Sequence, residues 1–200
     1  MSYSKFTFSR LKEKYKINQQ EIRLFKGIEI IPVVPSERLQ QDLQEAEEAP
    51  LLSEKAKSES IIAPIMRELK RNNYKNITIF SGYTFNIPGE NELSGAPDFL
   101  ISAKARIVEP QSPIFCLLES KNRSAEEGYA QCASEMYAAR LFNKKANEPY
   151  ETIYGAVTNA FEWIFMKLEG DTIYIDFKRY YLVELPKILG ILQYIVNQYK

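Results

Sequence analysis

The spacing of apolar and polar positions predicts alternating helices and strands over most of the chain. Helical spacing, in which apolar side chains recur every three or four residues, marks the segments 53–73, 125–145 and 185–199. Runs of alternating or β-branched residues mark strands within 76–87, 99–102, 114–118 and 151–158, and a hairpin over 163–177. The order is helix, three-strand meander, helix, strand, hairpin and helix. It predicts an α/β fold with a mixed sheet that helices cover on both faces.

The N-terminal quarter of the chain has a weaker pattern. Residues 5–25 mix apolar and charged positions and predict one or two short helices, and 28–34 is an apolar run interrupted by Pro32. The segment 36–49 predicts a helix with a narrow apolar stripe, ended by Pro50. We therefore predict one compact molecule with two parts, which are an N-terminal helical arm (1–52) and an α/β domain (53–200).

Composition and charge narrow the class of protein. The hydrophobic fraction is 45% and the charged fraction is 26%, as in ordinary soluble domains. Lys+Arg and Asp+Glu both total 26, so the net charge of zero gives no overall attraction to nucleic acid or to an anionic membrane. No apolar stretch reaches the roughly 18 residues of a membrane span, and the N-terminus lacks an apolar signal core. We expect a cytoplasmic protein with no membrane partner.

Histidine is absent from the chain, which excludes several catalytic chemistries. Ser-His-Asp and Cys-His catalysis and histidine-ligated metal hydrolases all require imidazole. The two cysteines, Cys116 and Cys132, lie in apolar patterns without the paired spacing of a zinc site. Any chemistry must therefore use carboxylates, lysine, hydroxyls and a bound metal.

One set of residues meets that requirement. Asp98 precedes the strand 99–102, and Glu119 and Lys121 follow the apolar run 114–118 at positions that share one face of a strand. If the two strands pair, two carboxylates and an ammonium group come together. One or two carboxylates suffice to hold Mg²⁺, and a lysine beside it can orient water or neutralise phosphate charge. Taken alone, a Glu-x-Lys tripeptide is more often a solvated pair at a strand end.

In this strand context, Pro97-Asp98 and Glu119-Ser120-Lys121 resemble the motif of the PD-(D/E)xK superfamily of restriction-endonuclease-like nucleases. The resemblance covers about residues 53–158, and the C-terminal hairpin and helix lie outside it. It implies a restriction-endonuclease-like core and a Mg²⁺-dependent endonuclease, with Mn²⁺ as a substitute, that hydrolyses phosphodiester bonds in DNA. It implies that Asp98, Glu119 and Lys121 are catalytic.

The resemblance also implies supporting roles for other residues. Asp98 and Glu119 would hold the metal, with the carbonyl of Ser120 and the acid Glu59 of the first core helix as further ligands. Gln131, on the helix after Lys121, occupies the place of a polar helper. For Glu59 a solvated position is equally expected, and for Gln131 a solvent-facing position is the more frequent alternative.

Several basic residues could bind nucleic acid locally, although the chain has no net charge. Arg67, Arg71, Lys75 and Arg123 could contact a phosphate backbone, although a solvated helix end is the commoner explanation for the first three. Because the net charge is zero, we keep an alternative, which is a catalytically inactive domain of the same fold that acts as a binding or assembly module. Cleavage of both strands of a duplex by one site per chain would favour a homodimer.

Overall fold

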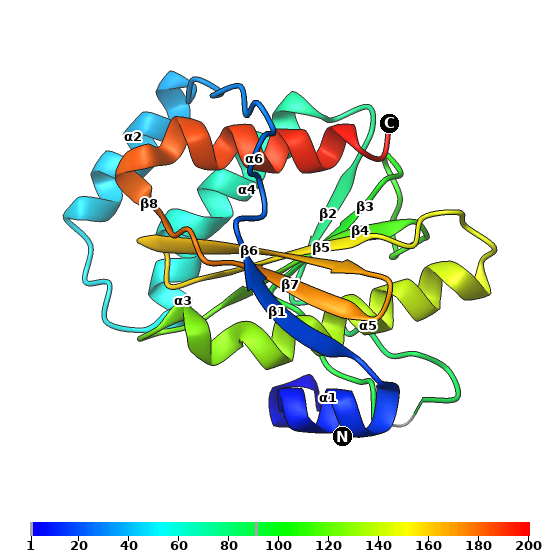
Figure 1. Ribbon diagram of the computed structural model, residues 1–200. Coiled ribbons are helices and arrows are strands. Elements are labelled where there is room, and N and C mark those ends of the chain that lie inside the picture. Colours follow the sequence, from blue (N-terminus) through cyan, green and yellow to red (C-terminus); the bar gives the residue numbers. More distant parts are fainter. Residues whose placement is uncertain (1, 91) are drawn as a thin grey trace.

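The computed structural model describes residues 2–90 and 92–200, and its centre is an open mixed sheet (Figure 1). Within this described chain the sheet has eight strands, in the order β1-β7-β6-β5-β4-β3-β2, with β8 pairing to β6. β4 and β5 are parallel, as are β1 and β7, and the other pairs are antiparallel. The strands are β1 (Asn18–Ile22), β2 (Thr78–Ser81), β3 (Phe99–Ser102), β4 (Ile114–Ser120), β5 (Ile153–Thr158), β6 (Glu162–Glu169), β7 (Thr172–Asp176) and β8 (Tyr180–Tyr181).

Helices cover both faces of the sheet, as predicted (Figure 1). One face carries α2 (Glu37–Glu47), α4 (Ala63–Asn72) and α6 (Leu185–Asn197), and the other carries α1 (Phe8–Tyr15) and α5 (Tyr129–Lys145). Short helical turns complete the chain, and they are η1 (Tyr3–Lys5), α3 (Glu54–Lys57), η2 (Ser58–Ile62), η3 (Ala125–Gly128) and η4 (Leu182–Glu184). Among the residues described, no helix combines the length and the apolar character needed to cross a bilayer.

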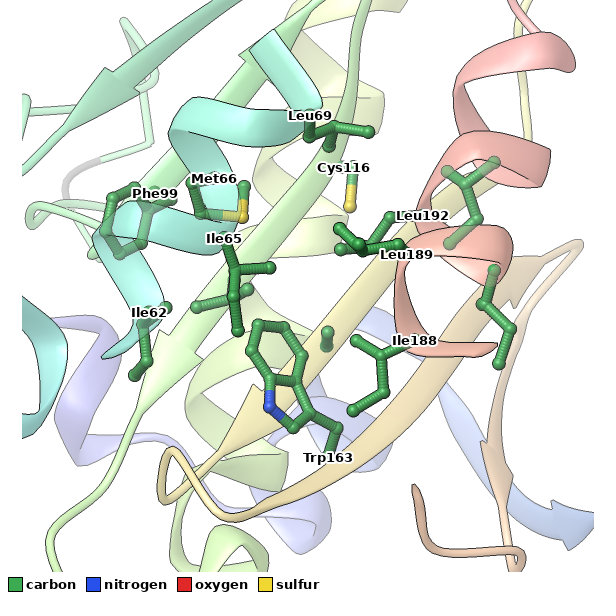
Figure 2. Close-up of a cluster of buried hydrophobic side chains, with 14 of the residues drawn as sticks. Ile62, Ile65, Met66, Leu69, Phe99, Cys116, Trp163, Ile188, Leu189 and Leu192 are labelled. Atoms are coloured by element: carbon green, nitrogen blue, oxygen red, sulfur yellow. The ribbon is translucent and has the colours of Figure 1, made fainter. Parts of the chain in front are cut away.

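The larger hydrophobic core lies between the sheet and the pair α4 and α6 (Figure 2). The predicted apolar stripe of α4 and the turn before it faces this core and meets side chains of α6 and of the sheet. Trp163 of β6 belongs to this core and is fully buried. The members labelled in Figure 2 are Ile62, Ile65, Met66, Leu69, Phe99, Cys116, Trp163, Ile188, Leu189 and Leu192.

Strand β4 lies in the middle of the sheet and is completely buried. All of its residues are buried, because helices cover both of its faces and β3 and β5 flank it. Leu118 belongs to the core beneath α4 and α6, whereas Leu117 belongs to the core beneath α5. A strand buried on both faces reads as a continuous apolar run, which is the pattern of residues 114–118.

The predicted helix over 53–73 is divided into three parts. Ser53 caps its N-terminus, since its hydroxyl accepts a hydrogen bond from the backbone N–H of Ala56 at 3.1 Å. The segment then runs through α3 and a π-helical turn, η2, before α4 begins, with Pro64 in the first turn of α4. Pro64 lacks the N–H of a regular helical hydrogen bond, which accounts for a division on its N-terminal side.

Two elements differ from the sequence-based expectation. Only Thr78–Ser81 of the segment 76–87 forms a strand, and the buried Phe85 and Ile87 belong to a loop, in which their N–H groups donate to the carbonyls of Gly95 and Leu93. The strand β1 was not predicted, because its sequence NQQEI is polar and largely exposed at the edge of the sheet. β1 forms a strand because its backbone pairs with that of β7, and its side chains carry no strand pattern.

The segment 28–35 crosses the outer face of α6. The N–H of Val33 donates to the carbonyl of Pro186 at 2.9 Å. At Gly190 the two backbones are so close that a β-carbon would lie 2.4 Å from the carbonyl oxygen of Ile31. This crossing therefore requires glycine at position 190.

Candidate active site at the end of β4

The pairing of β3 with β4 brings the predicted acids together. Phe99 of β3 pairs with Leu118 of β4 in an antiparallel register, so the preceding Asp98 lies beside Glu119. β4 runs parallel to β5, and its last residue, Ser120, pairs with Thr158. Asp98, Glu119, Ser120 and Lys121 thus gather at the carboxyl end of β4.

Ser120 holds the side chain of Asp98 in place. The N–H of Ser120 donates to Oδ2 of Asp98 at 2.7 Å, and the Ser120 hydroxyl donates to the same oxygen at 2.5 Å. Two donors on one carboxylate oxygen fix the orientation of the group and leave Oδ1 for other partners. The sequence predicted that the backbone carbonyl of Ser120 is a metal ligand. What the structure describes for Ser120 is a different role, in which its N–H and hydroxyl hold Asp98.

Glu119 and Lys121 lie on one face, as their spacing predicted, and form a buried ion pair. Nζ of Lys121 donates to Oε1 of Glu119 at 2.6 Å and to Oε1 of Gln131 at 3.1 Å. The side chain of Glu119 is 4% exposed and that of Lys121 is 17% exposed. Oε2 of Glu119 is buried and has no hydrogen-bond partner among the described residues, so it is a free acceptor within the site.

The environment changes the pKa values of both members of this pair. Burial first, and then the negative charge of Asp98, raise the pKa of Glu119 from its ordinary value of 4.5 to about 7, against the opposing effect of Lys121. Burial lowers the pKa of Lys121, but the charge and hydrogen bond of Glu119 outweigh it, and this pKa lies above its ordinary value. Perturbed carboxyl groups of this kind concentrate at functional sites.

Gln131 joins the site from α5 and connects it to a second buried acid. Its amide carbonyl accepts from Lys121, and its Nε2 donates to Oε1 of Glu135 at 3.2 Å. Burial, followed by the negative charge of Glu119, raises the pKa of Glu135 well above its usual range. Our sequence analysis missed Glu135, and the signal that could have found it is an acid within the apolar, alanine-rich face of this helix.

Glu59, the predicted acid of the first core helix, is not brought to this group. Its side chain is 68% exposed and its carboxylate lies 3.8 Å from Nζ of Lys55. Glu54, one turn earlier, is the acid near the site, since its negative charge raises the pKa values of both Glu119 and Lys121. Glu54 follows the cap Ser53 and is the first residue of α3.

Three of the predicted basic residues, Arg67, Arg71 and Lys75, have partners outside the group at the end of β4. Arg67 lies 3.9 Å from Asp42, Arg71 lies 2.5 Å from Glu68, and Lys75 lies over the ring of Tyr74. Lys75 precedes β2, whose first residue pairs with Ser102, at the end of β3 away from Asp98.

Arg123 is the member of that predicted set that lies at the site. It follows Lys121 by two residues, and its backbone carbonyl accepts from Nδ2 of Asn159 at 3.1 Å. Nearby, Nζ of Lys57 donates to the carbonyl of Asn122 at 2.6 Å. Lys57 and Arg123 are therefore two basic residues close to the end of β4.

The donor set fits a hard divalent cation. Within the described chain, no group of three or more His, Cys, Asp or Glu side chains is arranged to hold a metal ion. Mg²⁺ and Mn²⁺ instead accept one or two carboxylates and complete their coordination with water and substrate oxygens. Asp98 and the unpartnered Oε2 of Glu119 supply those two carboxylates.

Glu119 should make the stability of the metal-free protein depend on pH. Because its pKa is raised to about 7 in the folded state, the folded protein keeps this proton at a higher pH than the unfolded chain does. The resulting stabilisation is complete below the ordinary pKa of 4.5 and is lost as the pH rises through 7. Relative to Glu119→Gln, the wild type should lose about 3 kcal/mol of unfolding free energy over this interval.

Urea unfolding of both proteins at several pH values measures this difference. Glu59→Gln is the matched control, since it makes the same substitution at an exposed carboxylate. A difference between wild type and Glu119→Gln that stays constant across the interval would contradict the assignment of the raised pKa to Glu119.

The end of β4 thus gathers two carboxylates, one ammonium group and a buried amide–carboxyl pair. β3, β4 and α5 build it, and these elements follow one another in the order that the sequence predicted. When the chain was compared with protein-family models, with curated proteins and with solved structures, none of the three comparisons found a match.

Proposed function

We propose that the protein is a metal-dependent nuclease of the restriction-endonuclease-like fold, an endonuclease that hydrolyses phosphodiester bonds in DNA with Mg²⁺. The observation that carries this proposal is the convergence of Asp98, Glu119 and Lys121 at the end of β4. The order of helix, meander β2–β4, helix α5 and parallel strand β5 supports it, since this is the core order of the PD-(D/E)xK superfamily. No histidine is needed for this chemistry.

Each residue has a distinct role in the proposed reaction. Asp98, fixed by Ser120, and the free oxygen of Glu119 would hold the metal, which when bound would neutralise phosphate charge and make water a better nucleophile. The ammonium group of Lys121 donates hydrogen bonds to the attacking water or to a phosphate oxygen and stabilises the negative charge that develops there. Gln131 accepts from Lys121 and limits the directions that the ammonium group can take.

Substrate binding relies on local cations, because the whole chain has no net charge. Arg123 and Lys57 lie at the rim of the site and can contact phosphates on either side of the scissile bond. Cleavage of both strands of DNA would use two copies of the chain related by a twofold axis.

A second candidate is a catalytically inactive domain of this fold that serves as a binding or assembly module. It is favoured by an exposed apolar groove of about 630 Å³ near the β5–β6 turn, whose lining includes Leu43, Ile61, Phe161 and Tyr181. The pairing of Glu119 with Lys121 in the absence of metal is also compatible with a purely structural ion pair.

Cleavage and metal binding together test the proposal. The purified chain should nick or linearise plasmid DNA with Mg²⁺ or Mn²⁺ and not with a chelator, and calorimetry should detect Mn²⁺ binding. Asp98→Asn keeps an oxygen that can accept both hydrogen bonds from Ser120 but removes the charge, so it should abolish cleavage while the protein stays folded. Absence of both cleavage and Mn²⁺ binding in the wild type would favour the binding module.

A further inference from the structure

Glu135 is a buried acid that the proposed chemistry does not use. It lies on α5, one turn after Gln131, and its residue is 0% exposed. Oε1 accepts one hydrogen bond, from Gln131, and Oε2 is buried with no partner among the described residues. Burying a carboxyl group with so few hydrogen bonds costs stability, and an apolar residue would fit the surrounding alanine-rich helix at lower cost.

The single hydrogen bond of Glu135 fixes which way the amide of Gln131 points. An amide has a donor end and an acceptor end, and the two ends of Gln131 contact Glu135 and Lys121 respectively. If the amide turned over, its NH₂ group would face the ammonium group of Lys121, and two donors would oppose each other. An acceptor at position 135 therefore favours the orientation in which Lys121 keeps an oxygen partner.

The other polar groups near Glu135 form their described hydrogen bonds with other partners. Tyr3 of the N-terminal turn lies near Glu135: burial raises the pKa of Tyr3, and the charge of Glu135 adds to this effect. The Tyr3 hydroxyl, however, donates to the carbonyl of Phe85 at 2.7 Å. Lys121 shares its ammonium group between Glu119 and Gln131 rather than with Glu135. The link from Glu135 to the site therefore runs through Gln131.

Building on the nuclease function proposed above, we propose that Glu135 is a positioning residue of this site. It holds the Gln131 amide with its carbonyl toward Lys121, and Gln131 in turn fixes the direction of the Lys121 ammonium group between Glu119 and the substrate. Glu135 itself touches neither substrate nor metal. Its acceptor oxygen, rather than its charge, is the property that matters.

Two variants at this position separate positioning from packing. Glu135→Gln retains an acceptor oxygen, whereas Glu135→Leu fills a similar volume without one. Glu135→Leu should lower kcat of plasmid cleavage by about 10- to 100-fold with KM within about twofold, because a small misplacement of Lys121 affects the chemical step more than binding. Glu135→Gln should stay within about threefold of wild type in kcat. Equal kcat values in two folded variants would overturn the proposal.

A double-variant cycle tests whether Glu135 acts through Gln131. Gln131→Met removes the amide, so adding Glu135→Leu to it should lower kcat no further, within about twofold. A second loss equal to that seen in the wild-type background would show that Glu135 acts by another route and would overturn the proposal.

A measurement without catalysis distinguishes failure of this inference from failure of the nuclease function. In the metal-free protein, the side-chain amide signal of Gln131 in ¹H–¹⁵N spectra can be assigned by its loss in Gln131→Met. The signal should be kept in Glu135→Gln and should move to the position of a solvent-exposed amide in Glu135→Leu. If it does so in a chain without nuclease activity, the positioning contact stands and the nuclease function falls. If the signal is unchanged in Glu135→Leu, the positioning contact falls.

Discussion

Replacing Lys121 with methionine should lower kcat of metal-dependent cleavage by about 10³-fold. Methionine keeps much of the side-chain volume but removes the ammonium group that Glu119 and Gln131 hold. Without the ammonium group, position 121 offers no cationic donor to the attacking water or to the negative charge that develops on the phosphate. Single-turnover cleavage of a labelled duplex measures the chemical step directly, free of product release.

Mn²⁺ binding by the same variant should separate catalysis from metal affinity. Lys121 occupies one oxygen of Glu119 in the metal-free protein, so its removal should leave the Kd for Mn²⁺ unchanged or lower it. Lys167→Met is the matched control, because Lys167 likewise pairs with a carboxylate two residues away on its strand, Glu169 at 3.0 Å, at the end of β6 away from this site. It should change kcat by less than about threefold. Cleavage by Lys121→Met at near wild-type rates would remove lysine from the proposed mechanism.

Replacing Gly190 with alanine should lower the free energy of unfolding by about 3 kcal/mol. A β-carbon at this position would lie 2.4 Å from the carbonyl oxygen of Ile31 and 3.1 Å from Cγ2 of Ile30. The obstructing atom is backbone, so the segment 28–35 would have to lift from α6 and lose the hydrogen bond between Val33 and Pro186. Urea unfolding followed by the fluorescence of the buried Trp163 measures the loss.

Gly170→Asn is the control for this prediction. Gly170 lies in the β6–β7 turn with a φ of +53° and open space around its α-carbon, a conformation that asparagine tolerates. It should cost less than about 1 kcal/mol. If Gly190→Ala were as mild as Gly170→Asn, the segment 28–35 would be only loosely held on α6.

The alternation of helices and strands could be predicted because burial on one or both faces leaves a clear periodicity. The approach of Asp98 to Glu119 followed from two apolar runs that had to pair. β1 could not be predicted in this way, because a polar edge strand shows no periodicity and depends on the backbone of β7. The nuclease assignment itself stays a prediction.

The predicted acid of the first core helix depended on helical phase. Glu59 was expected near the site because the resemblance to the PD-(D/E)xK superfamily implies an acid on the first core helix. The π-helical turn Ser58–Ile62 adds to the residues per turn, so it rotates the part before it relative to α4. Glu54 then lies near Glu119 while Glu59 faces solvent. A local change of helix type leaves no reliable signal in the pattern of apolar residues.

The complete burial of β4 bears on how the site can adapt to a substrate. Leu117 and Leu118 belong to different cores on the two faces of the sheet, so a shift of the strand would disturb the packing on both sides at once. Glu119 and Ser120 therefore lie on a rigid strand, and Asp98 is hydrogen-bonded to it through Ser120. A substrate would therefore have to fit the arrangement of these groups, because the strand that carries them cannot shift to follow it.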